Sequence, residues 1–276
     1  MKNVDWKIYQ KALIPKSFPH EVKILKNEVK VILKESGCYF ARYTTDFDYG
    51  KVGQWYFVVK DTSLDVNSMK SKHRSMVMKG IRSFDVKIID PINFKEQLYF
   101  VLNESLSVYP EKYRKHYSKK QFDDIVDEWD KNNYDCFGAF DKETGELGGY
   151  ALTCKDSKFA ELLVVKTIPS LQRKQINAAI VCEICNVYMG DGGVKMINAG
   201  ERNIRHETNY QDYLLKYFGF RYAYCKLNVV YAPQVKFIVN CLYPFRSIIQ
   251  KISKINGFVY NVSCVLKQEE IRRSFV

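Results

Sequence analysis

One stretch of the chain constrains the fold more than any other, because three structural signals follow one another in it. The run 162–166, apolar up to Val165, stops shortly before Pro169. A short basic turn, 172–174, follows, and a helical pattern begins at Ile176. A strand, a turn and a helix in this order place free backbone N–H groups and positive side chains at a helix N-terminus. The stretch therefore predicts an anion-binding site suited to phosphate or pyrophosphate.

The composition is that of a globular protein with a strongly basic charge. Of 276 residues, 46% are hydrophobic, which is enough for a sizeable core. The formal net charge of +12 favours polyanionic partners, namely nucleic acid, phosphorylated cofactors or an anionic membrane surface, although solubility alone also explains it. We see no signal peptide and no long uncharged apolar span, so a reducing cytoplasm is the expected compartment. Cys182 and Cys185 have CxxC spacing, but they lie in a helical pattern without a second pair or a nearby histidine, so no metal is expected.

The first 90 residues read as a mixed segment of short strands and one helix. We expect strands over 29–33, 53–60 and 86–89, and a helix over 70–80 that ends at Gly80 as its C-cap.

The rest of the chain has a regular order of elements. We expect helices over 94–109 and 120–131, strands over 135–140, 147–154 and 159–166, a helix over 176–189, a strand over 194–200, a helix over 210–217 and a last strand over 221–231. The basic amphipathic stretch 236–254 either caps a core, which we favour, or lies on a membrane surface. The pattern as a whole indicates an α+β fold.

This order of elements resembles the acyltransferases of the GNAT superfamily over residues 91–232. Pro169 and the turn 172–177 align with that family's pyrophosphate loop, usually written Q/R-x-x-G-x-G/A. The run 162–166 aligns with the strand before it, and 214–220 looks like the family's late helix ending in a Gly-Phe pair. The resemblance implies a GNAT-like fold with a mixed central sheet flanked by helices, an acetyl-CoA or other acyl-CoA donor, and no metal.

The resemblance also assigns residues to the donor. They are Val164, Val165, Lys166, Gln172, Arg173, Lys174, Gln175, Ile176, Asn177 and Ala178. Both loop glycines of the family are replaced, by Gln175 and Asn177, and Leu215 stands where the family often has a tyrosine that acts as general acid.

The segment 68–80 with the strand 86–89 looks like the Fem-type branch of this fold. That branch implies a partial, degenerate acyltransferase-like half over 1–90 before the complete domain over 91–276, and it uses aminoacyl-tRNA as donor. Lys72, Arg74 and Lys79 would then hold RNA or a phosphorylated carrier; an exposed helix face is the simpler interpretation.

Candidate catalytic residues lie in the loop 198–209, between a strand and a helix. An amine acceptor must lose a proton as it attacks a carbonyl, so a base within hydrogen-bond reach helps. His206 titrates near neutral pH, and Glu201 and Glu207 can serve if their pKa values are raised. A polar surface loop is the alternative.

Three functions are consistent with these features. The first is an N-acyltransferase that moves an acyl group from a CoA-type or carrier thioester to an amine by direct attack. The second is a Fem-type aminoacyl-tRNA-dependent transferase. The third is a binding protein that keeps the GNAT fold without the chemistry. We expect a cytoplasmic location, with contact to an anionic membrane surface as an alternative, and the sequence leaves the acceptor and the oligomeric state open.

Overall fold

The chain divides into two compact units. The computed structural model describes residues 4–16, 18, 23–109, 111, 114–156, 158–190, 193–204, 209–253 and 255–275. Unit 1 comprises the described residues within Met1–Phe57, Glu201–Thr208 and Tyr222–Val276, and unit 2 those within Val58–Gly200 and Asn209–Arg221. Unit 2 has residues on both sides of residue 90, where the sequence predicts a domain boundary, and the two acyltransferase-like halves stay a prediction.

Unit 2 contains most of a seven-stranded mixed sheet. Its strand order is β10-β4-β9-β8-β7-β6-β5. The strands are β4 (Tyr56–Lys60), β5 (Phe84–Ile89), β6 (Asp135–Asp141), β7 (Leu147–Lys155), β8 (Phe159–Thr167), β9 (Met196–Glu201) and β10 (Arg221–Tyr224). The strands from β5 to β8 pair antiparallel, and β8 pairs with β9 in parallel. The parallel pair follows from the crossover through the helix between β8 and β9.

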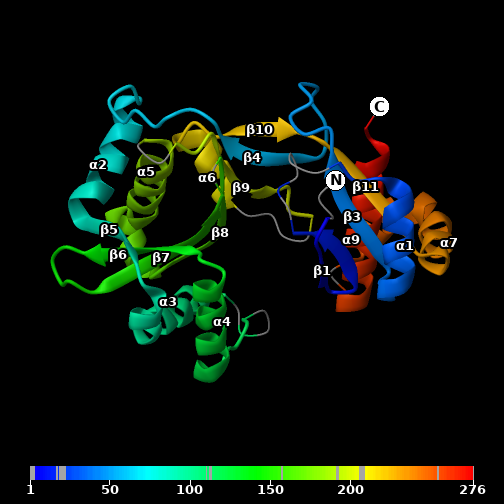
Figure 1. Cartoon of the computed structure of the whole chain (residues 1–276), viewed down its shortest axis with the longest axis horizontal. Coiled ribbons are helices and arrows are strands. Elements are labelled where there is room, and N and C mark those ends of the chain that lie inside the picture. The colour runs from blue at the N-terminus through cyan, green and yellow to red at the C-terminus, as the bar shows by residue number, and fades with distance from the viewer. Residues whose placement is uncertain are drawn as a thin grey trace. The chain divides into compact units, whose positions relative to one another are not determined.

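Helices cover both faces of the sheet in unit 2 (Figure 1). On one face lie α2 (Ser71–Ser83) and α5 (Ile176–Met189), and on the other α3 (Lys95–Ser107) and α4 (Lys119–Lys131); α6 is Asn209–Tyr217. In α4 the buried residues Phe122, Val126 and Trp129 recur at helical spacing and pack on a core shared with α3 and β7. The elements expected over 53–217 are confirmed close to their expected positions.

Gly80 is not the C-cap of its helix, so that expectation is wrong. The helix continues to Ser83, and Gly80 faces the first turn of α5. A Cβ atom at Gly80 would lie 2.6 Å from the carbonyl oxygen of Gln175 and 3.0 Å from the amide nitrogen of Ala179. The glycine therefore lets α2 approach the backbone of α5, at the end that follows the basic turn.

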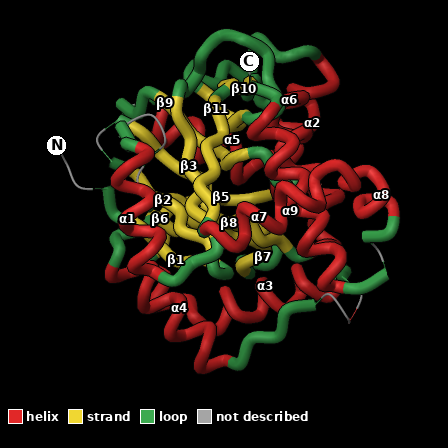
Figure 2. The backbone as a smooth tube through the Cα atoms, turned by 90° about the vertical axis from the view of Figure 1, so that its right-hand side faces the viewer, coloured by secondary structure: helices red, strands yellow, loops and turns green. Residues whose placement is uncertain are grey.

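Unit 1 has its own sheet and its own helices, whose labels can be found in Figure 2. The sheet has the order β1-β2-β3-β11. Its strands are β1 (Trp6–Tyr9), β2 (Ala12–Pro15), β3 (Phe40–Thr45) and β11 (Lys226–Tyr231). The helices are α1 (Lys26–Ser36), α7 (Pro233–Leu242), η4 (Tyr243–Phe245), α8 (Arg246–Lys251) and α9 (Gly257–Arg273). No helix in the part of the chain that the structure describes is long and apolar enough to cross a membrane.

Three expectations for unit 1 are wrong. The stretch 29–33 lies in α1 rather than in a strand, because Val29 and Leu33 are one helical turn apart and bury together. The expected strand over 221–231 is two strands, β10 and β11, in different sheets. The amphipathic stretch 236–254, which would form one helix in either of its two interpretations, is divided into α7, η4 and α8 over its described residues, since Pro244 cannot supply the N–H that a continuous helix needs.

Candidate functional site

The predicted donor turn has the backbone path of a glycine loop without the glycine. The 3-10 helix η3 (Pro169–Lys174) is followed by Gln175, which has a φ of 66° and begins α5. This left-handed conformation favours glycine, the residue that the resembled motif carries at this position. Gln175 therefore keeps the turn at a cost in backbone strain. Its side chain makes no capping hydrogen bond to α5.

The two cations of the turn have different surroundings. Lys174 Nζ donates to Asp141 Oδ2 at 2.9 Å and to Glu143 Oε2 at 2.7 Å. Burial alone would raise the pKa of Asp141, but the hydrogen bonds from Lys174 and from the Glu143 N–H outweigh it and lower the pKa. Arg173 is exposed, and no carboxylate among the described residues pairs with it. Of the two cations, Arg173 is therefore the one available to a ligand.

The other residues assigned to the donor tie the turn to the sheet. Thr167 Oγ1 donates to Asn177 Oδ1 at 3.3 Å, which joins the end of β8 to the first turn of α5. Ile176 and Ala178 are buried, so only their backbone is available to a ligand. The Ala178 N–H already donates to the Gln175 carbonyl at 3.0 Å.

Strand β8 has an open edge immediately before this turn. Its ladder with β9, both strands being fully described, pairs residues 159–161 with 196–198 and ends at Glu161 and Asn198. On the other side the pairing with β7 continues to Thr167, with an irregularity that leaves Leu163 as an extra residue. Such a bulge bends a strand and is frequent beside functional sites. Val164, Val165 and Lys166 therefore lie where the β9-facing edge of β8 has no ladder hydrogen bonds.

A cavity of about 380 Å³ lies in unit 2 against β8. Val164 and Lys166, two residues apart on the same face of the strand, contribute to its wall. The remaining lining residues come from β7, from α3 and α4, and from the segment between these helices: Leu102, Leu106, Tyr109, Lys115, Tyr117, Phe122, Ile125, Trp129 and Tyr150. The wall is therefore largely aromatic and aliphatic, with two ammonium groups.

Two titratable groups of this cavity, Lys166 and Tyr150, have pKa values that their surroundings shift. Burial lowers the pKa of Lys166, and the positive charge of Lys115 lowers it further. Tyr150 is almost fully buried in the same wall, and burial raises the pKa of its hydroxyl. At neutral pH the cavity thus holds a neutral phenol and an ammonium that gives up its proton more readily than a surface lysine.

Of the predicted catalytic residues, the structure describes Glu201. It lies at the end of β9, in unit 1, and forms an ion pair with Arg42 of β3. Burial raises the pKa of Glu201, and the charges of Arg42 and Lys7 act in the opposite direction. His206 and Glu207 lie outside the described residues, so their role stays a prediction.

Several groups of the site were not singled out by the sequence. Tyr117, Trp129 and Tyr150 read as ordinary core aromatics, and no local motif marks them as lining a cavity. On α6, the hydroxyls of Tyr210 and Tyr213 are buried and have no hydrogen-bond partner among the described residues. Within the same described part of the chain, no three His, Cys, Asp or Glu side chains are grouped to hold a metal ion.

Comparison with known proteins identifies the fold. No family model and no curated protein matches the sequence. FemX is similar in structure, with a TM-score of 0.53 and 12% identity over 77% of this chain and 77% of the other. The C-terminal domain of a putative lysylphosphatidylglycerol synthetase from Agrobacterium fabrum has a TM-score of 0.52 and 10% identity over 86% and 83%. L-PGS from Bacillus licheniformis has a TM-score of 0.52 and 12% identity over 85% and 83%. The chain has the GNAT-like acyltransferase fold.

Proposed function

We propose that the chain is an acyltransferase of the GNAT and Fem type that takes a phosphate-bearing donor at the start of α5. The observation that carries the proposal is the end of the β8–β9 ladder at Glu161 and Asn198, directly before the basic turn. An extended donor arm can form hydrogen bonds with the free edge of β8, while its phosphates lie at the N-terminus of α5. The shared fold with FemX supports the same reaction class.

Arg173 is the cation that we assign to the donor phosphates. It is exposed and without a described carboxylate partner, whereas Lys174 is held by Asp141 and Glu143. A guanidinium can also bind a phosphate through two hydrogen bonds, which an ammonium cannot.

The acceptor is an amine, and we assign it to the cavity beside β8. The reaction is direct: the amine nitrogen attacks the donor carbonyl, the bond to the leaving sulfur or oxygen breaks, and the leaving group takes up the proton that the amine releases. Positioning of the two reactants supplies much of the rate. The aromatic wall suits an acceptor with an apolar body, and the ammonium of Lys115 suits one that also carries a negative charge.

Lys166 and Glu201 are the described candidates for the base that takes this proton from the amine and passes it to the leaving group. The lowered pKa of Lys166 increases its neutral fraction, and the raised pKa of Glu201 makes its carboxylate a stronger base. Glu201 is ion-paired with Arg42, whereas Lys166 lines the cavity directly. We therefore place Lys166 first.

A Fem-type donor is the second candidate, and the turn itself favours it. Gln175 and Asn177 place side chains where glycines would let a CoA pyrophosphate approach the backbone. The phosphates of an aminoacyl-tRNA lie along a nucleic-acid backbone and differ in arrangement from the pyrophosphate of CoA. Because they are many, they also need a basic protein surface. Lys72 and Lys79 are exposed and seven residues apart, so they share one face of α2, and Arg74 lies on another.

Calorimetric titration of the full chain tests the proposal and separates the donors. Acetyl-CoA, a long-chain acyl-CoA and an aminoacylated tRNA are titrated separately, and we expect one class to bind. Arg173→Ala should weaken that binding about tenfold, because a charged phosphate contact is lost. Lys174→Ala is the matched control and should change the affinity by less than about twofold, since its charge is already paired.

Two results would contradict the proposal. If none of the three donors binds, the chain is a binding protein that keeps the fold without the chemistry. If Lys174→Ala weakens binding as strongly as Arg173→Ala, then Lys174 contacts the donor in spite of its ion pairs with Asp141 and Glu143. A fall in tRNA affinity with rising salt is required for the Fem-type donor, because phosphate contacts release counterions.

A further inference from the structure

Unit 1 contains a large groove whose rim is basic and whose floor is apolar. The groove has a volume of about 1130 Å³ and lies between α1, β11, α7 and α9. Leu33, Val229 and Val230 contribute to its apolar lining. This volume exceeds that of most small-molecule pockets, so a larger or extended ligand is the better match.

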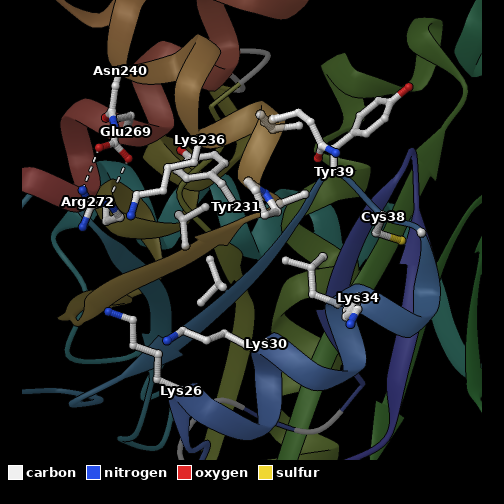
Figure 3. Close-up of a pocket in the computed structure, with 18 residues that line it drawn as sticks. Lys26, Lys30, Lys34, Cys38, Tyr39, Tyr231, Lys236, Asn240, Glu269 and Arg272 are labelled. Atoms are coloured by element: carbon white, nitrogen blue, oxygen red, sulfur yellow. Dashed lines mark hydrogen bonds and ion pairs between the residues drawn. The ribbon is translucent and has the colours of Figure 1, made fainter.

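The lysines of this groove come from two elements. Lys26, Lys30 and Lys34 recur every four residues along α1, and Lys236 projects from α7 (Figure 3). The three lysines of α1 therefore form one stripe, with like charges as nearest neighbours. We call the groove that these four lysines line the lysine groove.

None of the four lysines has a carboxylate partner among the described residues. Among the described residues that line the groove, Glu269 is the one carboxylate, and it is occupied by Arg272 at 2.7 Å and by Arg273 at 2.6 Å. The four ammonium groups thus form a positive field that the described protein does not neutralise. A ligand with several negative charges would supply the missing partners.

The helices beside the groove expose large apolar side chains. Phe237, Ile238, Phe245, Ile248, Ile255 and Phe258 are each more than half exposed, and we call them the C-terminal apolar residues. They come from α7, η4, α8, the described end of the α8–α9 connection, and the start of α9. Single exposed apolar residues are ordinary, but six within so short a segment are not.

Helix α7 joins the two features. Lys236 and Asn240 line the groove, and Phe237, which is 71% exposed, lies about 60° around the helix axis from Asn240. A flat partner that meets this side of α7 would therefore contact both cations and apolar rings.

The charge of the surrounding sequence selects the partner. No aspartate or glutamate occurs between Asp212 and Glu269, a stretch that contains β11, α7 and α8. A second copy of the chain would place this carboxylate-free surface against itself, which is unfavourable. RNA would bind the lysines but leaves the exposed isoleucines unexplained, since its contacts are phosphates and stacked bases.

We propose that this surface of unit 1 docks on a bilayer that contains anionic phospholipids. The lysine groove holds lipid phosphates, and the C-terminal apolar residues lie at the boundary between headgroups and acyl chains. Basic residues beside exposed aromatic and aliphatic side chains are the composition of interfacial helices that lie on a membrane. The surface is separate from the donor turn and the cavity beside β8, which are parts of unit 2.

Vesicle sedimentation with the full chain tests this proposal. One set of vesicles is pure phosphatidylcholine, and the other contains about 30 mol% phosphatidylglycerol. We expect at least about tenfold tighter binding to the anionic vesicles, and a decrease in that binding when salt rises to about 0.5 M.

Two pairs of variants separate the two parts of the surface. The double variant Lys30→Glu with Lys34→Glu should weaken binding at least tenfold, because each basic residue near the surface contributes about fivefold to the affinity. It should also remove most of the salt dependence of that binding. Its control is Lys158→Glu with Lys195→Glu, which reverses two exposed lysines of unit 2. Phe237→Ser with Phe258→Ser should weaken binding to a similar extent but keep the salt dependence. Its control is Phe100→Ser with Val52→Ser, at two other exposed apolar positions.

All of these side chains are exposed, so the variants should stay folded with thermal midpoints close to that of the wild type, which circular dichroism checks. Equal binding to both vesicle types would overturn the proposal, and so would control variants that lose binding as strongly as the test variants. Binding of tRNA that depends on Lys30 and Lys34, without vesicle binding, would assign the groove to nucleic acid instead. A dimer in light scattering that Phe237→Ser with Phe258→Ser dissociates, without vesicle binding, would assign the apolar residues to self-association.

Discussion

The basic turn of unit 2 and the lysine groove of unit 1 both carry positive charge, but they hold it differently. In the turn, Lys174 is fixed by two carboxylates of the neighbouring hairpin, and Arg173 alone has no described partner. In the groove, four lysines line a cavity where Glu269, the one carboxylate among the described lining residues, is occupied by arginines. A formal charge of +12 does not distinguish these cases. A paired cation stabilises the fold, whereas clustered unpaired cations cost stability and call for a partner outside the chain.

The largest expected effect is on the support of the turn. Gly80→Ala places a methyl group 2.6 Å from the Gln175 carbonyl oxygen, and backbone cannot move aside as a flexible side chain can. We expect a loss of about 2–3 kcal/mol in the free energy of unfolding, measured by urea titration, and weaker donor binding because α5 is displaced. Gly53→Ala is the control, because nothing lies within 4 Å of its added Cβ. An unchanged stability for Gly80→Ala would show that the turn is not held rigidly by α2.

The second effect tests whether the ion pair between Asp141 and Lys174 in the turn stabilises the fold. Asp141 is buried and has a lowered pKa, so its carboxylate stabilises the fold above its pKa in the unfolded chain, near pH 4. Asp141→Asn should lower the free energy of unfolding by about 2 kcal/mol at pH 7, and the difference should disappear as pH falls through the folded-state pKa. Glu143→Gln, at an exposed partner of the same lysine, should cost less than about 1 kcal/mol. A difference that does not depend on pH would contradict the assignment of Asp141 to the ion pair.

The sequence predicted unit 2 better than unit 1 for a physical reason. In unit 2 each element has a clear period and a clear end, such as the apolar spacing of Phe122, Val126 and Trp129. In unit 1 the strands are short, and the run that contains Val29 has branched apolar residues typical of a strand; its helical period is visible only together with Lys26 and Lys34.

The candidate site was predicted in the same uneven way. The turn is local in sequence, so Pro169 and the cations after it could be recognised. The cavity is not local, since it joins residues from Leu102 to Lys166, and no sequence spacing encodes such contacts. The pairing of Lys174 with Asp141 also needs the fold, because the two residues meet only when the hairpin and the turn are in place.

A third, smaller effect compares Lys166, a half-buried cation without a carboxylate partner among the described residues, with the paired Lys174. Lys166 has a lowered pKa because of burial and of Lys115, so its ammonium opposes folding below its folded-state pKa. Lys166→Met should raise the free energy of unfolding by about 1 kcal/mol at pH 7, and the gain should shrink as pH rises toward 10.5, where the lysine is neutral in both states. Lys158→Met, at an exposed position, should show neither change. If Lys166→Met lost transfer activity while gaining stability, the residue would be functional, and a loss of stability would contradict its placement beside the cavity.

The smallest expected effect decides the comparison between the basic turn and the lysine groove. A groove lysine that awaits a partner and a lysine that is structural predict changes of opposite sign in the free energy of unfolding. Lys30 has Lys26 and Lys34 as its helical neighbours, so removing its charge relieves two repulsions without changing helix propensity appreciably. Lys30→Gln should raise the free energy of unfolding by about 0.3 kcal/mol at low ionic strength, and the gain should vanish at about 0.5 M salt. Thermal unfolding of the two proteins at both salt concentrations measures it. Removal of a charge from the Asp141 ion pair destabilises unit 2, whereas removal of a groove lysine stabilises unit 1 and weakens vesicle binding. A loss of stability in Lys30→Gln would mean that the groove lysines are structural, and the two regions would then hold their charge in the same way.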